Sequence, residues 1–438
     1  MNQSETPQTT LTAQYAAFGI SEAVLGFARP VLEQLRGRFE MIDETAEYNQ
    51  LRVIRAMQEN HIGEAHLKGT TGYGYDDIGR DGLERVYASY FGTEDALVRP
   101  QISCGTHALA LALMGNLRPG DILVSAAGKP YDTLEEVIGI RPSRGSLAEY
   151  GIRYRQVDLK ADGSFDFEGI RSLLAEDSGH RIRLVTIQRS KGYQTRRTLS
   201  VTQIGEAISF IKKLRPDVTC MVDNCYGEFV ERIEPSHLGA DMVVGSLIKN
   251  PGGGLAPTGG YVVGKQDAIE RISYRLTAPG IGLEVGSYAA SYQPFYQGLF
   301  MAPHTVAQAI KTACLAARVF EDLGMTTTPA SSEPRADIIQ AIQMRSPERL
   351  IAFCQGIQMA APIDSMALPE PWAMPGYTDE VIMAAGTFVS GASVELSADA
   401  PMREPYTAYM QGGLTYAHGR IAIAQALQRM VDQGALTL

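Results

Sequence analysis

The chain is predicted to have an α/β fold, with a large, mainly parallel sheet domain and a small α+β domain toward its C-terminus. One observation behind this prediction is the alternation of short apolar runs with longer segments of helical periodicity. A second is that one apolar run ends at Asp223, and the next leads through Gly245 and Ser246 to Lys249. Because open parallel sheets bind ligands at the carboxyl ends of their strands, both side chains should reach one crevice.

Lys249 and Asp223 suggest a particular chemistry for that crevice. Lys249 follows Leu247 and Ile248 and stands 249 − 223 = 26 residues after Asp223. An amine in apolar surroundings loses solvation of its charged form, so we expect its pKa to fall and the amine to act as a nucleophile. Pyridoxal 5′-phosphate requires a lysine for its aldehyde and an acid for its ring nitrogen. Without Asp223, a surface lysine after a strand would be the simpler interpretation.

The length of the chain allows more than one domain. Its 438 residues, 45% of them hydrophobic, are enough for one large or two ordinary domains. Apolar positions at helical spacing predict an N-terminal helical arm over residues 1–60. Strand and helix patterns then alternate through a cofactor-binding domain over residues 61–300. Residues 301–438 are predicted to form the small C-terminal domain, which opens with a helical pattern from about Thr305 to Leu323.

Composition argues against several classes of function. A formal net charge of −10 disfavours nucleic acid or an anionic membrane as the main partner. The five cysteines are few and odd in number, which favours reduced thiols in a cytoplasmic protein. The polar N-terminal residues carry no secretion signal, and no apolar run is long enough to span a bilayer. His61 and His66 lack the spacing of zinc ligands, so no metal site is expected.

A turn of small residues, Ser103-Cys104-Gly105-Thr106, opens a helix after the predicted strand that begins at Ala96. Backbone N–H groups and the dipole at a helix N-terminus suit a phosphate group, and Thr106 adds a hydroxyl. An ordinary helix cap is the alternative for this turn.

Taken together, these residues resemble the cystathionine and methionine lyase family of pyridoxal-phosphate enzymes. Within it, the chain is most similar to the branch called aluminium resistance proteins, or cystathionine beta-lyases by provisional name. The family's Ser-x-x-Lys signature stands here as Ser246-Leu-Ile-Lys249, and its Val-Asp-Asn as Val222-Asp223-Asn224. The resemblance covers most of the chain from about residue 60 onward. It implies the fold type I architecture, which is that of aspartate aminotransferase.

The resemblance also implies a site shared between subunits. In the family, a loop ending in Leu-Glu carries a tyrosine and an arginine to the cofactor of a neighbouring subunit. Tyr73 matches the tyrosine, whereas Tyr75 stands where the arginine would be. The protein is therefore expected to be a homodimer or homotetramer, with Tyr73 and Tyr75 reaching a partner's cofactor.

Three further positions are compared with residues of known role in the family. Tyr131 matches the aromatic residue that stacks on the pyridine ring. Gly192 aligns with the asparagine that contacts the ring oxygen, so Arg189 or Ser190 would have to supply that contact instead. Arg403 best matches the arginine that holds the α-carboxylate of the substrate, with solvated surface as its alternative.

The sequence therefore predicts a pyridoxal-phosphate-dependent carbon–sulfur lyase. It would act on cystathionine, methionine or cysteine by β- or γ-elimination. Lys249 would bind the aldehyde and move protons, with Tyr73 assisting, and Asp223 would keep the ring nitrogen protonated. Gly105, Thr106 and Ser246 would seat the phosphate. The alternatives are an aminotransferase or other pyridoxal-phosphate reaction on the same fold, and a non-catalytic stress or binding protein that retains it.

Overall fold

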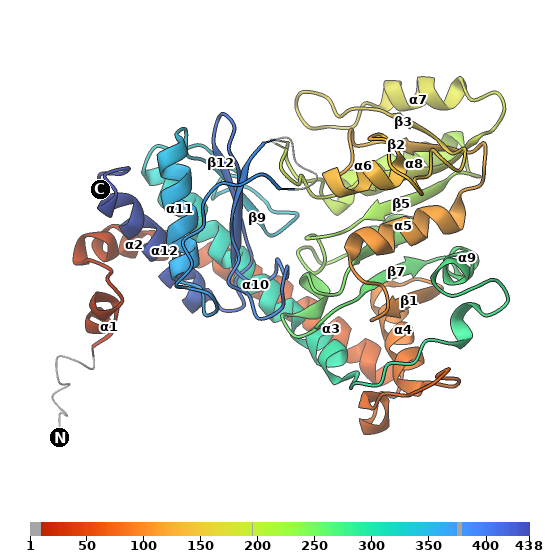
Figure 1. Ribbon diagram of the computed structural model, residues 1–438, viewed down its shortest axis with the longest axis horizontal. Helices are drawn as coiled ribbons and strands as arrows, with labels where there is room; N and C mark the ends of the chain where they lie inside the picture. Colours follow the sequence, from red (N-terminus) through yellow and green to blue (C-terminus); the bar gives the residue numbers. More distant parts are fainter. Residues whose placement is uncertain (1–9, 195, 375–378) are drawn as a thin grey trace. The chain divides into compact units, whose positions relative to one another are not determined.

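The computed structural model describes residues 10–194, 196–374 and 379–438 (Figure 1). This part of the chain forms two compact units. The large unit comprises residues 45–304 and 335–337, and the small unit comprises residues 10–44, 305–334 and 338–438. Residues 1–9 of the predicted arm lie outside the described residues. The three-part division into residues 1–60, 61–300 and 301–438 remains a proposal.

A mainly parallel sheet forms the interior of the large unit. Among the described residues it has seven strands in the order β1-β7-β6-β5-β4-β2-β3. The strands are β1 (Asp95–Arg99), β2 (Ile122–Ser125), β3 (Arg153–Gln156), β4 (Ile182–Gln188), β5 (Thr219–Asp223), β6 (Met242–Ser246) and β7 (Gly260–Gly264). In this described sheet only β7 runs opposite to the others, because it pairs antiparallel with both β6 and β1. The predicted α/β class is therefore confirmed.

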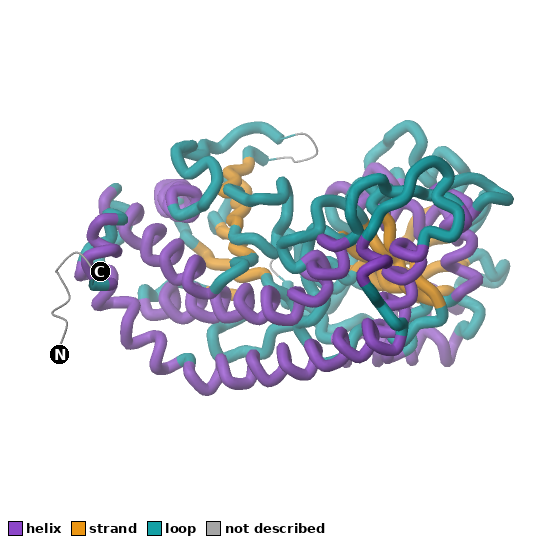
Figure 2. Tube along the Cα trace, turned by 90° about the horizontal axis from the view of Figure 1, so that it is seen from below, coloured by secondary structure: helices purple, strands orange, loops and turns teal. Residues whose placement is uncertain are grey.

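Helices surround this sheet and complete the apolar core. They are α4 (Ile78–Phe91), α5 (Gly105–Asn116), α6 (Asp132–Ile138), α7 (Phe167–Ala175), α8 (Val201–Leu214) and α9 (Gln266–Leu276). Figure 2 shows the strands in the interior of the large unit, with helices and loops around them. Leu109 and Leu113 of α5 pack with Met221 of β5, Val244 of β6 and Ile269 of α9 in one buried cluster. Burial on both faces explains why β5 and β6 read as continuous apolar runs.

The small unit contains an antiparallel sheet and several helices. Its described strands are in the order β10-β11-β12-β9-β8, with every neighbouring pair antiparallel. The bounds are β8 (Thr327–Thr328), β9 (Ile339–Gln343), β10 (Val381–Ala384), β11 (Ser397–Pro401) and β12 (Thr407–Gln411). Helix α11 (Pro347–Met359) packs on α12 (Tyr416–Asp432) and on β10, β11 and β12. This is the small α+β domain that the sequence predicts.

Two short N-terminal helices belong to the small unit, and two long helices contribute residues to both units. The short ones are α1 (Leu11–Ala17) and α2 (Glu22–Gln34), and the long ones are α3 (Arg36–Glu59) and α10 (Gln293–Asp322). The predicted start of α10 near Thr305 is wrong, because the helix continues through Pro303. Proline is usually excluded from helix interiors, which is why the sequence pattern favoured a later start.

Within the described ranges, no helix combines the length and apolar character needed to cross a membrane.

Candidate active site

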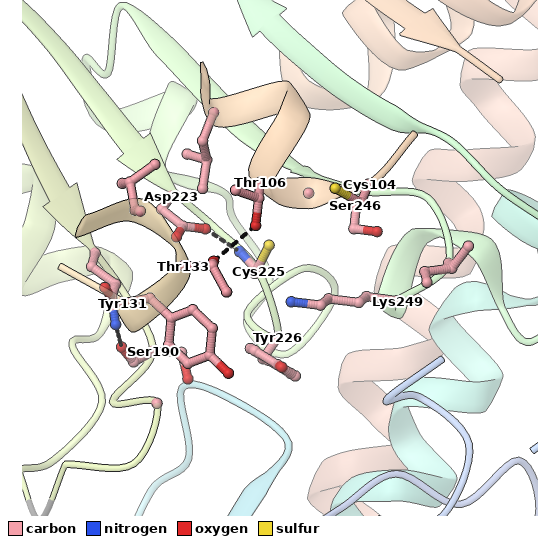
Figure 3. Close-up of a pocket in the computed structure, with 16 residues that line it drawn as sticks. Cys104, Thr106, Tyr131, Thr133, Ser190, Asp223, Cys225, Tyr226, Ser246 and Lys249 are labelled. Atoms are coloured by element: carbon pink, nitrogen blue, oxygen red, sulfur yellow. Dashed lines mark hydrogen bonds between the residues drawn. The ribbon is translucent and has the colours of Figure 1, made fainter. Parts of the chain in front are cut away.

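A cavity opens at the carboxyl ends of the central strands of the large unit (Figure 3). Its walls come from the N-terminus of α5, the start of α6, and the turns that follow β4, β5 and β6. The lining residues are Cys104, Gly105, Thr106, Leu109, Tyr131, Thr133, Leu134, Gln188, Ser190, Gly192, Asp223, Cys225, Tyr226, Ser246, Ile248 and Lys249. Six of the residues singled out from the sequence are therefore together: Gly105, Thr106, Tyr131, Asp223, Ser246 and Lys249.

Asp223 ends β5 beside the parallel strand β6, where its Cα pairs with that of Val244. The residue is only 8% exposed, and one carboxylate oxygen accepts a hydrogen bond from the Cys225 N–H at 3.2 Å. Burial raises the pKa of the carboxyl group, while the nearby Lys249 amine opposes that rise. A buried carboxyl beside an amine is suited to binding a positively charged ring nitrogen.

Lys249 follows β6 and precedes a short 3₁₀ turn, η4 (Asn250–Gly252). Its side chain extends into the cavity toward Tyr226 (Figure 3). The expected fall of its pKa is wrong. Burial does lower the pKa of the amine, but Cys225, Tyr226 and Asp223 outweigh burial, so the pKa is raised. The apolar residues Leu247 and Ile248 adjoin Lys249 in sequence, whereas the acidic groups reach it through the fold.

This raised pKa leads to a testable dependence on pH. Only an uncharged amine attacks an aldehyde, so the rate of pyridoxal-phosphate capture by cofactor-free protein should rise about tenfold per pH unit between about pH 7 and about pH 9. The rate should be divided by that of N-acetyl-lysine methylamide under the same conditions, which removes ionisations of the cofactor itself. The normalised rate should therefore stay constant over this range, whereas a normalised rate that falls as the pH rises would indicate a lowered pKa.

The N-terminus of α5 forms a cradle for an anion. The first N–H groups of a helix lack acceptors within the helix and can bind a phosphate. Cys104 is the N-cap residue, and its Sγ accepts from the His107 N–H at 3.4 Å. A Cβ atom on Gly105 would lie 3.3 Å from the Ser246 Cβ, so this glycine keeps the cradle open. The Thr106 hydroxyl hydrogen-bonds to that of Thr133 at 2.9 Å. Thr133 was not identified from the sequence, although it follows Tyr131 closely.

Behind the cavity lies a set of buried polar residues. Asn224 and Asn250, which directly follow Asp223 and Lys249, are both fully buried. The Asn224 side chain accepts from Arg189 at 2.7 Å and donates to Glu234 at 2.9 Å. These contacts hold the backbone that carries Asp223. Sequence analysis assigned no role to either asparagine, although their matching positions after the two candidate residues are a usable signal.

The backbone carbonyl of Glu228 fixes the second asparagine, accepting from the Asn250 side chain at 2.9 Å. The Glu228 carboxyl group is buried and accepts a hydrogen bond from the Tyr261 hydroxyl at 2.7 Å. Burial raises the pKa of this carboxyl group to about 8, so it is mostly protonated at neutral pH. The strand before Lys249, β6, therefore packs against the Glu228 carboxyl group, which is largely uncharged at neutral pH.

The side chains of Arg189 and Ser190 form hydrogen bonds with other protein residues. The sequence analysis proposed these two residues as replacements for the family's asparagine, whose place is taken by Gly192. The Arg189 guanidinium is fully buried and donates to Asn224 and to Glu231, the latter at 2.6 Å. Arg189 is thus a structural residue behind the cavity. The Ser190 hydroxyl donates to Asp337 at 2.8 Å.

Three predicted residues are not among those that line the cavity in the described part of this chain. Tyr73 and Tyr75 are 71% and 62% exposed, and their rings stack with centroids 5.4 Å apart. Arg403 belongs to the small unit, where its guanidinium forms a 3.0 Å ion pair with Asp379. The roles of these three residues remain predictions.

A comparison with known families identifies the family to which this fold belongs. A family model described as methionine gamma-lyase matches residues 25–431. The chain belongs to the methionine gamma-lyase family.

Relatives of this family member are similar over almost their whole length. Protein YnbB of Bacillus subtilis, described as uncharacterized, is 50% identical over 408 residues, which are 93% of this chain and 96% of that protein. A crystal structure from Clostridium novyi, described as a carbon–sulfur lyase involved in aluminium resistance, is 50% identical with a TM-score of 0.92. The match covers 95% of this chain and 98% of that one. A Clostridium acetobutylicum structure, provisionally named a cystathionine beta-lyase involved in aluminium resistance, is 48% identical with a TM-score of 0.92, over 95% and 98% of the two chains.

Proposed function

We propose that this methionine gamma-lyase family member is a pyridoxal-phosphate-dependent carbon–sulfur lyase. Its substrate would be a sulfur amino acid such as cystathionine, methionine or cysteine, cleaved by β- or γ-elimination. The observation that carries the proposal is the meeting of Asp223 and Lys249 in one cavity with the N-terminus of α5. The three features suit the ring nitrogen, the aldehyde and the phosphate of one cofactor.

Bound pyridoxal phosphate would supply an electron sink for the negative charge that develops at the α-carbon of the substrate. The chain's own residues would have separate tasks. Gly105, Thr106 and Ser246 would hold the phosphate, and Tyr131 would cover the ring. Asp223 would keep a proton on the ring nitrogen. Lys249 would bind the aldehyde and, once released by the substrate amine, carry a proton away from the α-carbon.

We further propose that Tyr73 and Tyr75 complete the site of a second subunit. In support, the loop that carries them is held in place although both rings are exposed. The Gly286 N–H donates to the Tyr73 carbonyl at 3.1 Å, and Arg80 donates to the Gly74 carbonyl at 2.7 Å. An ordered loop that presents two aromatic rings to solvent is typical of an interface.

Arg403 is proposed to bind the substrate α-carboxylate.

The reaction class is tested by products. Purified protein with pyridoxal phosphate should release a thiol and ammonia from at least one of cystathionine, methionine and cysteine. Formation of a new amino acid from an added oxo acid, without thiol release, would favour an aminotransferase. A protein that stays colourless with pyridoxal phosphate would contradict the proposal.

Replacing Asp223 by asparagine should weaken the chemistry far more than cofactor capture. The phosphate and lysine contacts remain in this variant, but the charge that stabilises a protonated ring nitrogen is lost. Loss of a charged hydrogen bond costs about 1.5–3 kcal/mol, so turnover should fall tenfold or more. Steady-state kinetics and cofactor titration measure the two effects separately. The matched control is Asp162→Asn, which changes an exposed carboxylate bonded to Ser164. Near-normal turnover in Asp223→Asn would remove this residue from the mechanism.

A further inference from the structure

Tyr226, to which the sequence analysis assigned no role, faces the amine of Lys249. The Lys249 Nζ atom lies 4.0 Å from the centroid of the Tyr226 ring. Both residues line the cavity, and Figure 3 shows the ring next to the end of the lysine side chain. A cation over an aromatic face is attracted to it, so the ring favours this position of the amine.

The backbone of Tyr226 is held in an uncommon conformation. Its φ is 73°, in the left-handed region that bulky residues rarely adopt. The turn around it is fixed on both sides: the Gly227 N–H donates to the Asn224 carbonyl at 2.9 Å, and the Asn224 N–H donates to the Val244 carbonyl at 2.9 Å. Backbone strain of this kind persists only where the surrounding structure imposes it, and it is concentrated at functional sites.

The cavity must also supply a donor for the ring oxygen of the cofactor. That oxygen is bonded to the ring carbon next to the one that bears the aldehyde. A hydroxyl group on a side chain in contact with the lysine amine can therefore reach it. Gly192 has no side chain to offer, and a Cβ atom there would lie 3.0 Å from the Tyr131 Cδ2 at a φ of 56°. A side chain at this position would therefore require Tyr131 to shift.

Several other polar residues of the described cavity wall are engaged with one another or with residues outside the cavity. The Ser190 hydroxyl donates to Asp337, and the Gln188 amide donates to the Ser190 carbonyl at 2.9 Å. Thr106 and Thr133 bond to each other at the N-terminus of α5. Cys225 offers only a thiol, which is a weak donor. Tyr226 combines a hydroxyl group with direct contact to the lysine side chain.

We propose that Tyr226 is a catalytic residue of this site: its hydroxyl donates to the ring oxygen of pyridoxal phosphate, and its ring holds the Lys249 amine against the aldehyde carbon. The inference rests on the proposed cofactor. A donor to the ring oxygen stabilises the negative charge there. That oxygen then binds the proton of the lysine–cofactor linkage less strongly, and the linkage loses this proton at lower pH.

The first test isolates the hydroxyl group. In Tyr226→Phe the cofactor should still bind, but the pH midpoint of its absorbance change should rise by about one unit or more, as expected for a lost hydrogen bond to a charged atom. Tyr154→Phe is the matched control, because the Tyr154 hydroxyl lies on β3 and bonds to Gln156 at 2.9 Å. An unchanged midpoint in Tyr226→Phe overturns the contact with the ring oxygen.

The second test needs no cofactor. Reductive methylation of Lys249 by formaldehyde, followed by peptide mapping, reports the pH at which the amine becomes reactive. Removal of the aromatic ring should move this pH downward, because the ammonium form loses its contact. Tyr226→Phe should move it downward by less, because this variant keeps the ring and loses only the hydroxyl group, whose hydrogen bond to the amine also raises the pKa of Lys249. Tyr226→Leu removes the ring, and Tyr226→Gly does so with a residue that accepts the left-handed backbone if the leucine variant does not fold.

The outcomes distinguish a failure of the proposed function from a failure of the proposal about Tyr226. If the wild-type protein forms no coloured complex, the proposed function fails, while the methylation experiment still tests the contact between Tyr226 and Lys249. If the complex forms and neither variant alters its titration or the methylation profile, the inference about Tyr226 fails alone.

Discussion

Replacing Lys249 by alanine is expected to abolish covalent capture of pyridoxal phosphate and to lower turnover by about 10³-fold or more. The variant loses both the amine that binds the aldehyde and the group that moves the substrate proton, and acid–base catalysis alone contributes about 10²–10⁴-fold. No second lysine lines the described cavity to replace this amine.

Borohydride reduction of the coloured protein, followed by peptide mapping, provides the decisive measurement. The cofactor label should be on Lys249 in the wild-type protein and absent from that peptide in the variant. Lys265→Ala serves as the control, since Lys265 is an exposed lysine whose amine pairs with Asp241 at 2.7 Å. A label on any other lysine would contradict the assignment.

Mixing two inactive variants is expected to restore activity if the site is shared. Tyr73→Phe and Lys249→Ala should each lose most activity as homodimers. When they are refolded together in equal amounts, about half of the dimers contain one chain of each kind, and each such dimer has one intact site of two. Activity should therefore recover to about a quarter of the wild-type level.

The control for this experiment mixes two variants whose substitutions both lie in the cavity of the same chain. Asp223 and Lys249 line one cavity of one chain, so a mixture of Asp223→Asn and Lys249→Ala should show only the mean of its separate components. If the Tyr73 mixture behaves like this control although mixed dimers have formed, Tyr73 acts within its own subunit or has no role in the reaction.

Much of the architecture follows from local patterns in the sequence. Apolar runs of strand length, each ending in a polar residue, predicted β5 and β6, and the rule for parallel sheets placed their carboxyl ends together. The helix that begins at Gly105 was predicted from a turn of small residues before an apolar segment. These features depend on residues close in the chain, which is why the sequence alone reveals them.

Helix boundaries and the directions of side chains were harder to predict from the sequence. The start of α10 was missed because Pro303 is a reliable helix breaker in isolation, whereas this helix is long enough to continue through it. Arg189 could have pointed into the cavity or away from it, and only its contacts with Asn224 and Glu231 show that it lies behind. A one-residue change in position along a strand end reverses the direction of a side chain.

The sequence by itself determined that Asp223 and Lys249 stand at the ends of neighbouring strands, because strand length and apolar pattern are local properties. The tertiary structure decided which groups surround the amine of Lys249. Leu247 and Ile248 adjoin it in sequence and predicted a lowered pKa, but Cys225, Tyr226 and Asp223 approach it from the end of β5 and the turn that follows, and together they raise the pKa. Electrostatic energies depend on distance in space, so groups 23 to 26 residues earlier in the chain (249 − 226 and 249 − 223) together outweigh the effect of burial.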